Sequence, residues 1–333
     1  MTEDPNRSDA PMDAAVNPRT AIGVTLGLAV LGYLAFAVWS DLKRTTDALG
    51  TFRWSLYLPV LALTLVNYGL RFAKWSWLLN HLGVNMPRKA NAWAFTAGLG
   101  MVVSPGKAGE LVKPWLVREV TGVPMARTLP ALFTERMTDG VAVVVLSAFG
   151  VSTFVPDSTG LILGTLGTLT VGLVVFSIYP LTDAILRVFG RLPLVGRFEA
   201  KLTEMVHSLR TCLGPTALVV TLILSMVAWF AECVGYWLVF QGLGVDCSIE
   251  LATFLYAFAT VFGAAMPGGL GVADAALVSG AIKFIPGLDP SVALVAALLI
   301  RFATLWFGVL LGVVPLLRLD AVVRDGRAEL AAA

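Results

Sequence analysis

Long runs of apolar residues, separated by short polar stretches, make up most of this chain. A helix needs about 20 apolar residues to cross a bilayer. Six runs are close to that length, and each predicts a full transmembrane helix: 21–39, 56–79, 129–151, 161–180, 215–240 and 292–317. The pattern predicts an all-α polytopic membrane protein.

Two further apolar regions, 92–125 and 251–286, are interrupted near their centres by proline and glycine. Each arm has about 13–18 residues, or roughly 20–27 Å at 1.5 Å per residue, which is short for a span. Irregular backbone at membrane depth is tolerated only where protein or a wet cavity surrounds it. We therefore expect two re-entrant helical hairpins with tips near Pro105 and Pro267.

The residue types at both breaks suit a hinge. Proline removes a backbone donor and disfavours helix in the residue before it, and glycine permits a tight reversal. The alternative is a kinked span packed through its glycines. The predicted hinge residues are Pro105, Gly106 and Gly109 in the first region and Pro267, Gly268, Gly269 and Gly271 in the second.

The predicted elements occur in the order span, span, hairpin, span, and the second half repeats that order in the opposite orientation. At a constant offset of 161, Arg71 falls on Glu232 and Trp75 on Tyr236. Paired broken helices in corresponding positions indicate a transporter built from an inverted repeat. We assign the first repeat to 21–155 and the second to 156–318.

Three segments flank or interrupt the repeats. Residues 1–20 are polar and predict a disordered N-terminal tail, residues 181–214 predict amphipathic helix in the membrane interface, and residues 319–333 form a C-terminal tail. Segment 181–214 carries five basic residues and the tail carries arginines, which favours a multi-pass protein of the cell (inner) membrane with both termini cytoplasmic. Loop 40–55, with Lys43, Arg44 and Arg53, argues against that orientation.

Composition supports the membrane assignment. The 333 residues are 57% hydrophobic and 14% charged, with a mean hydropathy of +0.81. A soluble domain has about 25% charged residues. The net charge of +2 and the lack of a basic stripe give no indication of nucleic-acid binding.

An acidic residue follows each break, and a lone arginine follows on the next apolar helix. Glu110 and Arg136 are 26 positions apart, and Asp274 and Arg301 are 27 apart. Charges inside a membrane are costly and usually functional. We predict that each acid forms a salt bridge with its arginine and that both pairs line one cavity. A salt bridge there would break so that its arginine can bind a phosphate-bearing head group. The alternatives are a structural ion pair and an acid that only favours a helix N-terminus.

Other charged residues are open to two interpretations. Arg136 can also pair with Asp139 on its own helix at i,i+3. Lys107, like Lys113 and Arg118, either forms a cationic entrance for a lipid phosphate or snorkels toward the interface. The same two interpretations apply to Arg71 and Lys74. We expect Trp75, Trp77 and Trp93 to be interface anchors.

No motif indicates cofactor chemistry. His81 and His207 are far apart, no His/Cys cluster has zinc spacing, and no nucleotide-binding or nucleophile motif occurs. We therefore expect no cofactor, no metal and no enzymatic activity, and we expect Cys212, Cys233 and Cys247 to form no disulfide.

Several of these residues carry a resemblance to a known family. The order Arg71…Trp75, Pro105-x-Lys107-x-Gly109-Glu110, Glu135-Arg136-x-x-Asp139 and Pro267-Gly268-Gly269-Leu270-Gly271…Arg301 resembles the lysylphosphatidylglycerol synthase transmembrane (flippase-like) family. That family includes the membrane half of the multiple peptide resistance factor. The resemblance covers about residues 21–317 and implies re-entrant helices and movement of lipids between leaflets.

Two departures from the family pattern limit what the resemblance implies. The family often has Arg where Lys107 stands and Glu where Asp274 stands, so the substrate is not carried over. The chain ends at Ala333 without room for a soluble aminoacyl-transferase domain, and we expect no lysylphosphatidylglycerol synthesis.

The leading hypothesis is a flippase or scramblase for an anionic phospholipid, glycolipid or polyprenyl-phosphate lipid. The alternatives are a membrane-embedded transferase with Glu110 or Asp274 as base, and an accessory subunit of a lipid-modifying enzyme. The expected partners are membrane lipids, with a homo-oligomer or a lipid-synthesising enzyme as further candidates. Arg71 and Glu232 are candidates for coupling transport to protons, as are Glu110 and Asp274.

Overall fold

The structure is a computed structural model, and it describes residues 42–104, 109–154, 160, 164, 167, 199–264 and 266–332. All the regular secondary structure in these residues is helical, which confirms the all-α prediction. The predicted spans 21–39 and 161–180 lie outside the described residues, apart from Gly164 and Gly167. So do the N-terminal tail, most of segment 181–214, and three predicted tip residues of the first hairpin: Pro105, Gly106 and Lys107.

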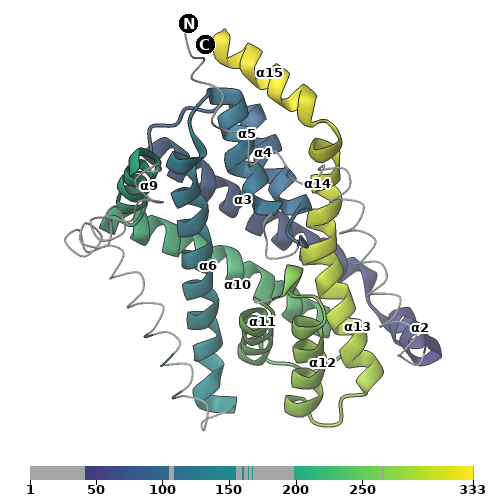
Figure 1. Ribbon diagram of the computed structural model, residues 1–333. Coiled ribbons are helices and arrows are strands. Elements are labelled where there is room, and N and C mark those ends of the chain that lie inside the picture. The colour runs from purple at the N-terminus through teal and green to yellow at the C-terminus, as the bar shows by residue number, and fades with distance from the viewer. Residues whose placement is uncertain are drawn as a thin grey trace, which may run out of the picture.

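The helices form one bundle in which the long ones run side by side (Figure 1). Three helices in the described part are long and apolar enough to cross a membrane: Trp54–His81, Pro215–Gly242 and Pro290–Leu317. The chain is therefore a multi-pass membrane protein. The helices are α2 (Leu42–Thr51), η1 (Trp54–Leu56), α3 (Tyr57–His81), α4 (Arg88–Gly100), α5 (Val112–Thr121), α6 (Met125–Phe154), α9 (Glu199–Cys212), α10 (Pro215–Gly242), α11 (Ile249–Gly263), η5 (Pro267–Gly269), α12 (Val272–Phe284), α13 (Pro290–Arg301), η6 (Phe302–Trp306), α14 (Phe307–Leu317) and α15 (Leu319–Ala331).

Two predicted elements differ from the simple apolar span. α6 has 30 residues and covers the predicted span 129–151, but its first half carries four charges, so it is not among the three apolar spans. The span that contains Arg301 is continuous but changes at Phe302–Trp306 to a single π-helical segment, η6. Such segments insert an extra residue per turn and are frequent at functional sites.

Both interrupted regions consist of two short helices. α4 and α5 have 13 and 10 residues, and α11 and α12 have 15 and 13. The second break takes backbone angles that favour glycine, with φ of +58°, +71° and +77° at the glycines of positions 268, 269 and 271. At the first break, a Cβ on Gly109 would lie 2.6 Å from the Cβ of Met101, so only glycine fits there.

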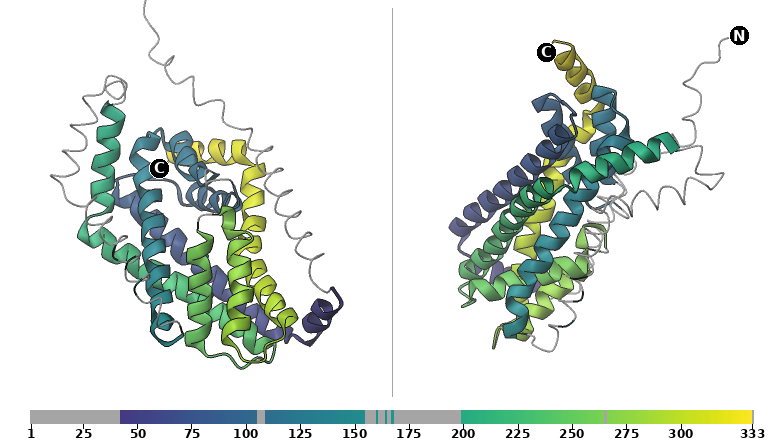
Figure 2. Two further views of the ribbon diagram at one scale, coloured as in Figure 1. Left: turned by 60° about the horizontal axis from the view of Figure 1, so that its bottom comes forward. Right: turned by 90° about the vertical axis from the view of Figure 1, so that its left-hand side faces the viewer.

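The two short-helix pairs lie toward opposite ends of the long helices, and their inner ends meet. Figure 1 and the left view of Figure 2 show α4 and α5 near one end of the bundle and α11 and α12 near the other. Val102 and Val103, just after α4, share an apolar cluster with Leu270 of the second break and with Leu305 of η6. The breaks therefore lie against each other beside the π-helical segment.

Local structure repeats at the offset of 161 residues that the sequence indicates. α3 ends at His81 and α10 at Gly242, and the following glycines, Gly83 and Gly244, have φ of +69° and +70°. The four backbone hydrogen bonds that close these helix ends occur between equivalent residues in both copies. Across the bundle, the Asn67 side chain donates to the carbonyl oxygen of Ala228 at 2.8 Å, and these two residues are themselves 161 apart.

The C-terminal tail is helical. α15 packs against α4 and α5 and places Gly326 against Ala90 and Val120. Arg327 of α15 forms an ion pair with Glu119 of α5 at 3.1 Å. The tail is therefore attached to the first short-helix pair.

Candidate functional site

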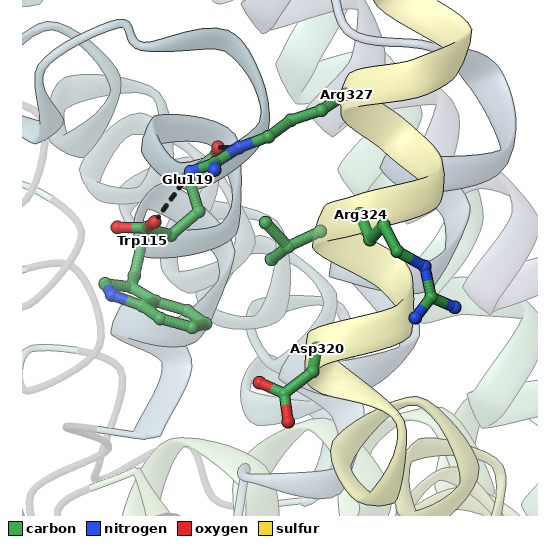
Figure 3. Close-up of a pocket in the computed structure, with 6 residues that line it drawn as sticks. Trp115, Glu119, Asp320, Arg324 and Arg327 are labelled. Atoms are coloured by element: carbon green, nitrogen blue, oxygen red, sulfur yellow. Dashed lines mark hydrogen bonds and ion pairs between the residues drawn. The ribbon is translucent and has the colours of Figure 1, made fainter.

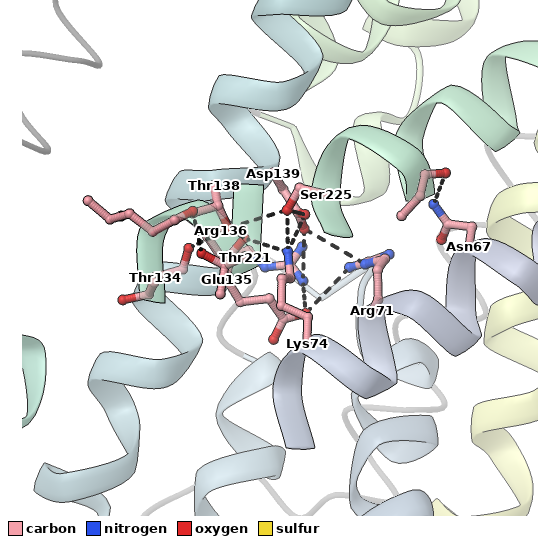
Figure 4. A network of polar contacts seen from close by, with 12 residues as sticks. Asn67, Arg71, Lys74, Thr134, Glu135, Arg136, Thr138, Asp139, Thr221 and Ser225 are labelled. Carbon is pink, nitrogen blue, oxygen red and sulfur yellow. Dashed lines mark hydrogen bonds and ion pairs between the residues drawn. The ribbon is translucent and has the colours of Figure 1, made fainter. Parts of the chain in front are cut away.

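A group of charged side chains lies between α3, α5, α6 and α10 in the interior of the bundle, and we call it the charged cluster. Figure 4 shows its members from α3 and α6, with Ser225 of α10 beside them. Burying these charges costs desolvation energy unless each is paired. The cluster comprises Arg71 and Lys74 of α3, Glu110 just before α5, Lys113 in its first turn, and Glu135, Arg136 and Asp139 of α6.

Lys74 is the most enclosed cation of the cluster, because its side chain has no solvent exposure. Its ammonium lies 2.5 Å from an oxygen of Asp139 and donates to the hydroxyl of Ser225 on α10 at 2.8 Å. Ser225 in turn donates to the same Asp139 oxygen at 3.0 Å. The three side chains hold α3, α6 and α10 together.

Glu135 is the acid on which most of the cluster converges. Its side chain is fully buried, and its two oxygens lie 2.5 Å from the Lys113 ammonium and 2.8 Å from the Arg136 guanidinium. Lys113 also lies 4.4 Å from the ring centroid of Trp75, which adds a cation–π contact. Glu135 thus connects the second helix of the first short-helix pair to α6.

Arg71 is held more loosely than the two lysines, and Arg136 is more exposed than they are. The closest ion-pair distances of Arg71 are 3.8 Å to Asp139 and 3.9 Å to Glu135, which are too long for hydrogen bonds. Arg136 is the most exposed of the cluster's cations, with 27% of its side chain accessible, and its Nε lies 3.2 Å from Glu110. The Nε atoms of both arginines and one oxygen of Asp139 are buried without a hydrogen bond. Donors therefore remain available for an anionic ligand.

The charges of the cluster do not balance. It holds four cations, namely Arg71, Lys74, Lys113 and Arg136, and three acids, namely Glu110, Glu135 and Asp139. Within the cluster itself the difference is one positive charge. An uncompensated buried charge is unfavourable, so the cluster is suited to receive one negative charge from a ligand or from a neighbouring acid.

A second ion pair lies at the other break. The Nε of Arg301, at the end of α13, lies 2.8 Å from an oxygen of Asp274 in the first turn of α12. The same guanidinium donates to the carbonyl oxygen of Gly268 at 2.5 Å, and Asp274 accepts from the backbone N–H of Gly271 at 2.9 Å. Arg301 and Asp274 together fix the backbone of the second break.

Glu232 of α10 is buried between these two groups. Its carboxylate accepts a hydrogen bond from the hydroxyl of Tyr256 on α11 at 2.7 Å. Arg71 of the charged cluster and Arg301 of the second ion pair both lie within electrostatic range of it.

The structure confirms the two predicted ion pairs and the i,i+3 contact of Arg136 with Asp139 at 3.7 Å. Within the described contacts the pairs belong to two separate groups, and a single cavity lined by both stays a prediction. Lys107 lies outside the described residues.

Burial decides one open interpretation and contradicts one prediction. Of the two interpretations of Lys74 and Lys113, snorkelling to the interface does not hold, because Asp139 and Glu135 neutralise both lysines in the interior. Trp75 is fully buried rather than an interface anchor, and its indole N–H donates to Asn91 at 3.0 Å. Trp93 has 41% of its surface exposed, as an anchor requires.

The central role of Glu135 and the contribution of Ser225 were not predicted from the sequence. Glu135 adjoins Arg136 in the motif, so an additional acid beside a predicted site residue was an available signal. Ser225 is one neutral residue in an apolar helix, and no pattern marks it.

A shallow cavity of about 380 Å³ lies on the surface between α5 and α15 (Figure 3). Its walls carry both signs of charge: Trp115 and Glu119 of α5 form one side, and Asp320, Arg324 and Arg327 of α15 form the other. It is distinct from the charged cluster, and its mixed charge selects for no single class of ligand.

Comparison with known proteins gives two matches. A family model described as the lysylphosphatidylglycerol synthase TM region matches residues 21–312. A UPF0104 membrane protein of Methanothermobacter thermautotrophicus is 27% identical over 311 residues, which cover 86% of this chain and 90% of that protein. No solved structure matches.

Proposed function

This chain belongs to the lysylphosphatidylglycerol synthase transmembrane family, and we propose that it moves a lipid with a phosphate-bearing, anionic head group between membrane leaflets. The observation that carries the proposal is the buried charged cluster with its excess of one positive charge. The family's relation to a phospholipid is consistent with that chemistry.

Arg71 and Arg136 are the residues that would bind the phosphate. Guanidinium groups bind phosphate through paired hydrogen bonds, and both arginines have a buried Nε without a hydrogen bond. Lys74 and Lys113 are tied to Asp139 and Glu135 at 2.5 Å and would instead hold the site in shape. The exposure of Arg136 makes it the first contact for a head group that approaches from the lipid phase.

The architecture proposed for this transport is an inverted repeat of six spans and two re-entrant hairpins. Support comes from the agreement of helix ends and turn glycines at an offset of 161 residues. Further support comes from the contact of Asn67 with Ala228, because residues related by a two-fold axis meet each other where the axis passes. Two related halves around a central site suit alternating access.

A transporter accounts for the acids better than a transferase does. Glu110, Glu135, Asp139 and Asp274 each lie in an ion pair, which leaves them poor general bases. We place the protein in the cytoplasmic membrane with both termini inside. Arg318, Arg324 and Arg327 at the end of the last span support that orientation.

Reconstitution into vesicles tests the function directly. Fluorescently labelled phosphatidylglycerol is placed in both leaflets, and the loss of signal on adding a membrane-impermeant quencher reports its transfer to the outer leaflet. Wild-type protein should accelerate transfer over empty vesicles. Removing a hydrogen bond to a charged group costs about 1.5–3 kcal/mol. Arg136→Gln and Arg71→Gln should each slow transfer by roughly 10- to 150-fold.

Arg324→Gln is the matched control, because it removes the same charge from a side chain that is 76% exposed, outside the charged cluster, and paired with its neighbour Asp325. Its transfer rate should equal that of the wild type. Equal rates for Arg136→Gln and Arg324→Gln would refute the phosphate site, and no acceleration by the wild type would refute lipid transfer.

A further inference from the structure

Glu232 differs from the other buried acids of the bundle. It is 4% exposed, and within the described residues it has a hydrogen bond from Tyr256 but no ion pair. Glu110, Glu135, Asp139 and Asp274 each have a cationic partner within 4 Å. A buried carboxylate without a paired cation gains least from being ionised, so Glu232 is the acid best placed to exchange a proton.

The ten interior charges at the two breaks and between them, counted over the part of the chain that the structure describes, balance only when Glu232 is ionised. The cations are Arg71, Lys74, Lys113, Arg136 and Arg301, and the acids are Glu110, Glu135, Asp139, Asp274 and Glu232. Five charges of each sign cancel. When Glu232 takes up a proton, the interior carries one positive charge, and a bound phosphate monoester or diester restores neutrality.

We propose that binding of an anionic head group at the charged cluster is linked to uptake of one proton by Glu232. This inference rests on the proposed function, because it assigns the energetic coupling of the same site. Binding and protonation are reciprocal: the anion increases the proton affinity of Glu232, and the proton increases the affinity for the anion by the same factor.

The hydroxyl of Tyr256 allows Glu232 to be hydrogen-bonded in both protonation states. It lies 2.7 Å from the Glu232 carboxylate and 3.2 Å from the hydroxyl of Thr304 in η6. The phenol donates to Glu232 when the acid is ionised. When the acid is protonated, it donates to the phenol oxygen and the phenol donates to Thr304.

The same hydrogen bonds connect Glu232 to the π-helical segment η6 and, through it, to the second break. Thr304 belongs to the π-helical segment that directly follows Arg301, and Arg301 holds the backbone of the second break. The charged or titratable groups that face Glu232 come from four helices: Tyr68 and Arg71 of α3, Asp139 of α6, Tyr256 of α11 and Arg301 of α13. The two arginines favour the anion of Glu232 and Asp139 opposes it.

The experiment compares wild type with Glu232→Gln, which fixes the neutral form of the side chain. Phosphatidylglycerol transfer in vesicles and binding of short-chain phosphatidylglycerol in detergent are both measured between pH 5 and pH 9. In the wild type, affinity should fall by about tenfold per pH unit once Glu232 is ionised in the free protein. In Glu232→Gln, affinity should not change with pH and should match the low-pH wild type. Glu119→Gln, which removes a partly exposed acid of α5 that pairs with Arg327 away from the charged cluster, is the charge-matched control and should keep the wild-type pH profile.

Proton uptake gives a second, independent readout on unmodified protein. Adding short-chain phosphatidylglycerol to the wild type in weak buffer should consume up to one proton per lipid bound, and phosphatidylcholine should consume none. This measurement decides the question even if Glu232→Gln fails to fold.

The outcomes separate the coupling from the transport function itself. Binding without proton uptake, or the same pH profile in wild type and Glu232→Gln, overturns the coupling and leaves the proposed function intact. A wild type that neither binds nor moves phosphatidylglycerol at any pH overturns both.

Discussion

Variants of the ion pair between Arg301 and Asp274 can test its role in stability separately from its role in transport. The perturbations are Arg301→Ala, Asp274→Ala and the double substitution. Arg301 is 9% exposed and Asp274 8%, so each single change leaves a charge in the interior without its partner. Removing one partner of a buried ion pair typically costs about 3–5 kcal/mol.

The two single variants should lose different amounts of unfolding free energy, because the residue that remains has different neighbours in each. After Arg301→Ala, Asp274 keeps its hydrogen bond from the Gly271 N–H and its favourable place in the first turn of α12, so we expect a loss of about 3 kcal/mol. After Asp274→Ala, Arg301 keeps only the Gly268 carbonyl oxygen, and α12 loses the hydrogen bond that caps its start. We expect about 4–5 kcal/mol for this variant.

The double variant leaves no unpaired charge and should lose only the cap, about 1–2 kcal/mol. It should therefore be more stable than Asp274→Ala alone. Equilibrium unfolding of the four proteins in mixed detergent micelles gives these differences. Additive losses in the double variant would refute the reasoning, because they would mean that the two charges do not stabilise each other.

Transfer of labelled phosphatidylglycerol by the double variant then decides what the pair does. We expect it to be slowed at least about tenfold, which corresponds to about 1.4 kcal/mol in the barrier, because the second break has lost the side chain that fixes it. Normal transfer by a stable double variant would make the pair purely structural.

Three further predictions concern buried residues. Lys74→Met leaves Asp139 without its closest cation and should lower the unfolding free energy by about 3–5 kcal/mol in the same unfolding measurement. Gly312→Ala should destabilise strongly, since its Cβ would lie 2.2 Å from a backbone nitrogen of α4, whereas Gly69→Ala, with open space around it, should be neutral or stabilising by up to about 1 kcal/mol. Burial raises the pKa of Cys247, between α10 and α11, to about 12, so mass spectrometry should find this thiol unmodified by maleimide at pH 7.5 until the protein unfolds.

The parts of the fold that depend on one segment at a time could be predicted from the sequence. Long apolar runs must be helical in a membrane, and proline with glycine must break them, so α3, α10, the span from Pro290 to Leu317 and the two short-helix pairs follow from local sequence. The Glu110–Arg136 and Asp274–Arg301 pairs were predictable for a related reason: isolated charges in apolar segments need partners.

The interior of the cluster depends on packing, and no pattern in the sequence determines it. Lys113 reaches Glu135 only because α5 folds back against α6, and a lysine in the same segment could equally extend to the interface. Likewise, Trp75 and Trp77 are two residues apart on one helix, yet only Trp75 is fully buried, because it faces Asn91 of α4. The side of the helix that faces protein is set by its neighbours.

The place where the two halves differ is more informative than the places where they agree. At the offset of 161, the helix ends and turn glycines coincide, and Trp75 and its counterpart Tyr236 are both fully buried. Four residues before each of these aromatics, the first copy has Arg71 and the second has Glu232. These two lie within electrostatic range of each other, one loosely held in the charged cluster and the other without an ion pair in the described residues. The contact of Asn67 with Ala228 puts the crossing of α3 and α10 one helical turn away. Symmetry between the two copies does not require opposite charges at these equivalent positions. Packing does not require them either, because apolar side chains would fill the same space. Under the proposed coupling, these are the positions where the head group and the proton bind.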